Sequence, residues 1–118
     1  MAKTSKKQTY RIRGRIWIES NNEAFLGSGR VELLEKVKEY GSISKAAKAM
    51  KMSYRQAWEL IDSMNSKAKN PLVIKQSGGK NGGGASITEA GEEAISTFKN
   101  LREEMFQFLE MKNKNLKV

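Results

Sequence analysis

Apolar and polar residues alternate near the start of the chain, between residues 10 and 19. One set of alternate positions is apolar or small: Tyr10, Ile12, Gly14, Ile16 and Ile18. The other set is mainly basic: Arg11, Arg13, Arg15, Trp17 and Glu19. A period of two is typical of a half-buried strand. The pattern therefore predicts a strand over 10–18 with a basic outer face, which would complete a sheet or support a dimer. Residues 1–9 are polar and are expected to form a disordered basic tail.

After residue 29 the apolar residues have the spacing of a helix. Apolar residues recur every three positions over 31–40, and Gly41 is a typical helix stop. A second, short amphipathic helix is predicted near 44–51, with Ser44 as its N-cap. Ala46 and Ala47 are small residues on its inner face, which would let the next helix cross it closely after a tight turn, as in a helix-turn-helix.

A capping box opens the third predicted helix. Ser53 and Gln56 have the S-x-x-Q spacing, in which each side chain satisfies a backbone N–H group of the other residue. The helix is expected to span about 53–68. Its predicted inner face is made of Tyr54, Ala57, Trp58, Ile61 and Met64.

A hairpin and a long helix follow. Short apolar runs at 72–74 and 85–87 flank a glycine-rich loop, which is the pattern of two strands joined by a long tip. Thr88 is the expected N-cap of a last helix over 88–112, with a disordered tail at 113–118. The order of elements predicts an α+β fold: a winged helix-turn-helix domain over 10–87 and a long C-terminal dimerisation helix.

Composition narrows the function. The chain has 118 residues and a net charge of +9, and it lacks both Cys and His. This excludes disulfides, zinc fingers and Cys/His catalysis. No apolar run is long enough for a membrane span, and the start of the chain has no secretory apolar region. We therefore expect a cytoplasmic protein without a cofactor or metal, and not an enzyme.

Positive charge is concentrated in two blocks. Residues 1–18 carry six cations and no acid, and residues 41–80 carry eight cations and two acids. Such blocks indicate contact with a polyanion. In a helix-turn-helix the second helix inserts its N-terminal residues into the major groove. We expect Arg55 to bind guanine and Gln56 to bind adenine. The predicted DNA-binding residues are Ser44, Lys45, Ser53, Tyr54, Arg55, Gln56, Glu59, Lys75 and Lys80.

Other interpretations of these motifs stay open. The helix pair also suits a helical hairpin with a solvated polar face. The glycine-rich loop could hold a nucleotide phosphate, but a P-loop needs Ser or Thr after Gly-Lys, and Asn81 stands there. We therefore favour a wing that rests on DNA phosphates through Lys75 and Lys80, with a merely flexible tip as the alternative.

The last helix carries an apolar seam. Its residues step by three, four and three positions, as in a heptad pattern: Phe98, Leu101, Met105 and Phe108. Phe106 and Leu109 widen the strip. The seam predicts a homodimer, and packing against the same chain is the alternative.

Several segments together resemble one family. The runs GSISKAAKAM at 41–50, MSYRQAW at 52–58 and TEAG at 88–91, with the glycine-rich wing, resemble the N-terminal DNA-binding domain of ModE-type molybdate-responsive regulators. The similarity covers about 29–108, and the domain is also similar to the LysR-type winged helix. The resemblance implies a transcriptional regulator that dimerises, binds palindromic operators in double-stranded DNA and is linked to molybdate metabolism.

The same resemblance has a limit. Full-length members carry molybdate-binding modules beyond the region matched here, so we expect no direct molybdate binding by this chain. Two alternatives remain open. Glu59 and Asp62 weaken the basic face, which suits a winged helix that binds protein instead of DNA. A small ligand could also bind in the dimer crevice.

Overall fold

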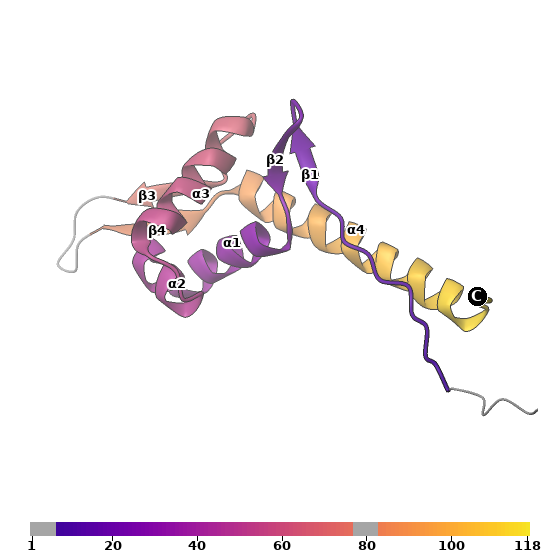
Figure 1. Cartoon of the computed structure of the whole chain (residues 1–118). Helices are drawn as coiled ribbons and strands as arrows, with labels where there is room; N and C mark the ends of the chain where they lie inside the picture. Colours follow the sequence, from indigo (N-terminus) through magenta and orange to yellow (C-terminus); the bar gives the residue numbers. More distant parts are fainter. Residues whose placement is uncertain (1–6, 77–82) are drawn as a thin grey trace, which may run out of the picture.

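Helices α1 (Ser28–Tyr40), α2 (Ile43–Ala49) and α3 (Tyr54–Lys67) pack around the hydrophobic core. The computed structural model describes residues 7–76 and 83–118. Two hairpins flank the helices, and the helix α4 (Glu89–Lys114) leaves them as a long arm (Figure 1). The molecule measures 77 × 28 × 23 Å, and the arm extends it away from the helical core. The predicted winged helix-turn-helix with a long last helix is confirmed.

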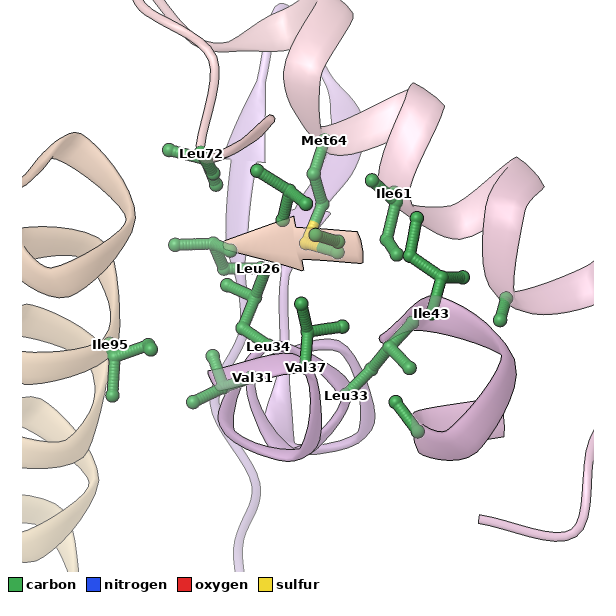
Figure 2. Close-up of a cluster of buried hydrophobic side chains, with 14 of the residues drawn as sticks. Leu26, Val31, Leu33, Leu34, Val37, Ile43, Ile61, Met64, Leu72 and Ile95 are labelled. Atoms are coloured by element: carbon green, nitrogen blue, oxygen red, sulfur yellow. The ribbon is translucent and has the colours of Figure 1, made fainter. Parts of the chain in front are cut away.

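The core is built on α1, which contributes Val31, Leu33, Leu34 and Val37. Figure 2 shows these side chains together with Ile61 and Met64 of α3, while Ile95 reaches the same cluster from α4. The small residues Ala46, Ala47 and Ala57 are buried where α2 and α3 cross. The small size of these residues allows the close approach that a helix-turn-helix needs.

Two positions of the predicted inner face of α3 differ from the expectation. Tyr54 lies in the first turn and is 46% exposed, and Trp58 is only partly buried. Both rings lie on the side of α3 toward the second hairpin, where Lys75 covers them. Helical spacing identified the aromatic positions correctly but could not show how far the core extends beneath them.

Side-chain caps fix the starts of three helices. The predicted capping box of α3 and the Thr88 cap of α4 are both confirmed. The prediction that Ser44 caps α2 is wrong, because the helix begins at Ile43 and Ser42 is its N-cap. The Ser42 hydroxyl accepts a hydrogen bond from the Lys45 N–H at 3.2 Å. Ser44 therefore lies inside the first turn and is exposed there.

The wing is an antiparallel hairpin of β3 (Val73–Gln76) and β4 (Gly84–Ile87), with Val73 opposite Ile87 and Gln76 opposite Gly84. The Ala85 N–H donates to the Gly41 carbonyl at 3.0 Å. This bond ties the wing to the turn between α1 and α2, so the base of the wing has a fixed position beside the helix-turn-helix.

The strand predicted over 10–18 is wrong for most of its length. The observed strand β1 (Ile18–Ser20) pairs with β2 (Glu23–Leu26) in a separate hairpin, and neither belongs to the wing sheet. Residues 7–17, which we call the strap, have no strand partner and lie along α4 (Figure 1). The strap is held by a helix, because Asn113 bonds both backbone groups of Ile12.

The arm is longer than the sequence predicted. α4 continues to Lys114, so the first two residues of the tail expected at 113–118 are helical. Within the described parts of the chain, no helix combines the length and the apolar character required to cross a bilayer.

Candidate nucleic-acid interface

The first turns of α3 form an exposed polar surface. The side chain of Arg55 is 88% exposed, and its Nε donates to Glu59 Oε1 at 3.1 Å. Gln56 turns back toward the helix start, where its Oε1 accepts from the Ser53 N–H at 3.0 Å. The structure thus brings Arg55 and Glu59 together on one exposed face, and Gln56 and Ser53 form the cap beside it. Tyr54 is also exposed, but its ring lies toward the wing.

Lys75 connects the wing to this helix. Its ammonium lies 4.1 Å from the centre of the Trp58 ring and 5.7 Å from that of Tyr54. A cation at this distance from an aromatic face is attracted by the ring electrons. The predicted wing cation is therefore fixed against α3. Sequence reasoning missed Trp58 as its partner, although two aromatic residues one helical turn apart were visible.

A hollow of about 330 Å³ separates the wing from the helix-turn-helix. Its polar lining includes Ser42, Ser44, Tyr54, Lys75 and Gln76. Hydroxyl and ammonium groups of this kind contact phosphate oxygens in protein–DNA complexes. Lys45 is exposed on α2 nearby in the sequence. Lys80 belongs to residues 77–82, so the prediction for it lies outside the described residues.

The predicted dimer seam is only partly exposed. Phe98 is fully buried in the core of its own chain, so its assignment to a dimer contact is wrong. Met105 is partly buried, and it lies close to the strap. A Cβ atom added to Gly14 of the strap would be 3.8 Å from the Met105 sulfur. Leu101 and Phe108 remain 42% and 54% exposed. Met111, which sequence reasoning missed, is 58% exposed on the same arm.

Comparison with known proteins agrees with this fold. A family model described as bacterial regulatory helix-turn-helix protein, lysR family, matches residues 29–92. A crystal structure of a LysR family transcriptional regulator aligns with a TM-score of 0.54 at 21% identity, over 76% of this chain and 30% of that chain.

Curated relatives carry the ModE name. The chain is 36% identical over 91 residues to the molybdenum transport protein ModE of Azotobacter vinelandii, which covers 77% of this chain and 34% of the relative. It is 35% identical over 83 residues to the DNA-binding transcriptional dual regulator ModE of Escherichia coli K12, covering 70% of this chain and 32% of the relative. The chain thus spans about a third of the length of these relatives.

Proposed function

Because the chain belongs to the lysR family of bacterial regulatory helix-turn-helix proteins, we propose that it regulates transcription by binding specific sequences in double-stranded DNA. In this proposal α3 enters the major groove and the wing rests on the adjoining backbone. The observation that carries it is the exposed start of α3, with Arg55 and Glu59 at its surface and Lys75 fixed beside it. The family match also favours a regulator over an enzyme.

Charge supports DNA as the partner. The net charge is +9, and the hollow between α2 and the wing adds hydroxyls and an ammonium suited to phosphate. Phosphate contacts of this kind provide affinity without sequence preference, whereas base contacts provide specificity. The two contributions are expected from different side chains of the same surface.

We further propose a homodimer that binds a palindromic operator. Leu101, Phe108 and Met111 leave apolar surface exposed on the protruding arm. An exposed strip of this kind is typical of a surface that is covered by a partner. Two copies joined through their arms would present two α3 helices, as operator half-sites about 34 Å apart require. The name of one relative, molybdenum transport protein ModE, connects this proposal to molybdenum.

The proposal is tested by selecting bound duplexes from a random DNA pool and measuring affinity against salt. We expect one enriched palindromic motif and an affinity that falls steeply with salt, because binding releases counterions from the DNA. A pool without an enriched motif, with weak salt dependence, would instead favour the protein-binding alternative.

A further inference from the structure

The exposed ridge of α3 carries acidic as well as basic side chains. Arg55 lies in the first turn, and Glu59 and Asp62 follow on the same side of the helix, all of them exposed. Carboxylates repel DNA phosphates, so an acidic side chain on a helix that enters the groove lowers affinity for DNA unless it also contacts a base. The contacts of Gln56 and Arg55 indicate which role Glu59 has.

The side chain of Gln56 already forms a hydrogen bond in the capping box of α3. Recognition of adenine by a glutamine uses both atoms of its amide, the oxygen toward N6 and the nitrogen toward N7. Here Gln56 Oε1 accepts from the Ser53 N–H and Ser53 Oγ accepts from the Gln56 N–H, both at 3.0 Å. Reaching adenine would therefore break the Gln56 half of the capping box, the bond from the Ser53 N–H to Gln56 Oε1. The adenine contact expected from the sequence does not fit this geometry.

Arg55 is held by Glu59 instead. The bond from Arg55 Nε to Glu59 Oε1 is 3.1 Å long, and both side chains stay exposed, at 88% and 62%. An exposed pair of this kind adds little stability. It does, however, restrict the flexible arginine and leaves its terminal amino groups available. Those groups match the O6 and N7 acceptors of guanine.

Glu59 has a second carboxylate oxygen beside this position. Cytosine presents only an amino donor in the major groove, whereas thymine, guanine and adenine all present acceptors there. Adenine also presents an amino donor, but its N7 acceptor lies beside that donor and repels a carboxylate. The preferred neighbour of Glu59 is therefore cytosine, whose amino group has no acceptor beside it.

We infer that Arg55 and Glu59 act as one base-reading unit, in which Glu59 orients Arg55 on guanine and itself accepts from a cytosine amino group beside it, while Gln56 contacts no base. The inference rests on the proposed DNA binding and defines its chemistry: each half-site should contain a G·C-dependent position. It also explains why an acidic residue stands on the reading face.

Selection from a random duplex pool tests this with the full chain and three variants. In Glu59→Ala we expect the preference for the G·C position to fall by roughly 5- to 150-fold, the range for one good base contact. Binding to random DNA should not weaken, because a negative charge has been removed. A purely structural role of Glu59 would not produce this separation.

Asp62→Ala and Gln56→Glu are the matched controls. Asp62→Ala removes the same charge one turn away and should leave the motif unchanged. Gln56→Glu keeps the capping box, because Glu also occurs at this position of the motif. It adds a negative charge, so it should weaken binding to all sequences alike without changing the preferred bases. An unchanged motif in Glu59→Ala, or a changed base preference in Gln56→Glu, overturns the inference and leaves the proposed function intact. If the parent chain enriches no motif, both fail.

Discussion

The ammonium of Lys75 lies 4.1 Å from the centre of the Trp58 ring, so a cation of the wing is packed against the helix proposed to enter the major groove. Lys75 is on β3 and Trp58 is on α3, and the contact links the two elements that would touch DNA. At an exposed site such a contact contributes about 0.5–1 kcal/mol. It positions a charge more than it stabilises the fold.

Lys75→Ala should therefore weaken binding to all DNA sequences alike. One lost phosphate contact lowers the slope of log affinity against log salt by about one. Fluorescence anisotropy with operator and random duplexes at several salt concentrations measures both quantities. Lys114→Ala, which removes the same charge at the far end of the arm, should leave the slope unchanged. A loss confined to the operator would assign Lys75 to base recognition instead.

Local patterns predicted the starts of α3 and α4 correctly, although they misplaced the start of α2 and the end of α4. The Ser53 capping box and the Thr88 cap involve residues three positions apart, so their whole geometry is visible in the sequence. The strap is different, because the partner of Ile12 is Asn113, 101 positions away. Alternation showed that one side of residues 10–18 would be covered, but not that a helix would cover it.

Phe98 and Phe108 illustrate the same limit within α4. Both lie on the apolar side predicted from the spacing, yet Phe98 is fully buried in its own chain and Phe108 is 54% exposed. The spacing defines which side of a helix is apolar. Whether a residue on the apolar side is buried in its own chain depends on where the compact domain ends along the helix. The spacing of residues within the helix carries no information about that boundary.

The packing around Gly91 explains why the TEAG motif ends in a glycine. A Cβ at this position would meet the Leu72 carbonyl oxygen and would lie 2.6 Å from Ile87 Cγ2. Gly91→Ala should therefore destabilise the fold by about 1–3 kcal/mol, as overpacking of a close contact does. Thermal unfolding followed by circular dichroism measures the change. Gly29→Ala, where a Cβ meets nothing within 4 Å, is the control and should not lower stability. Equal melting temperatures for both variants would contradict this packing.

The strap depends on one side chain of α4. Asn113 Oδ1 accepts from the Ile12 N–H at 2.7 Å, and Asn113 Nδ2 donates to the Ile12 carbonyl at 3.3 Å. Asn113→Ala removes both bonds, which together contribute about 1–3 kcal/mol. We expect faster hydrogen exchange at the Ile12 amide and little change in the core. Asn100→Ala on the same helix is the control and should leave exchange at the Ile12 amide unchanged. If this amide exchanges as fast in the parent chain as in Asn113→Ala, the strap is not held by Asn113.

The exposed strip on the arm should hold two copies together. In the proposed dimer Phe108 is buried by the partner, so Phe108→Glu would place a carboxylate in an apolar contact. Burying an unpaired charge costs several kcal/mol, which is enough to dissociate a small interface. Light scattering at micromolar concentration should give twice the chain mass of 13.3 kDa for the parent and the single mass for the variant.

The control for this experiment is the neighbouring residue. Gln107→Glu adds the same charge one position away, on another side of α4, and should leave the dimer intact. Operator affinity should follow the oligomeric state, because half-sites about 34 Å apart require two linked α3 helices. A parent chain that remains a monomer at these concentrations would refute the dimer. A dimer that both variants retain would place its contact elsewhere than on Phe108.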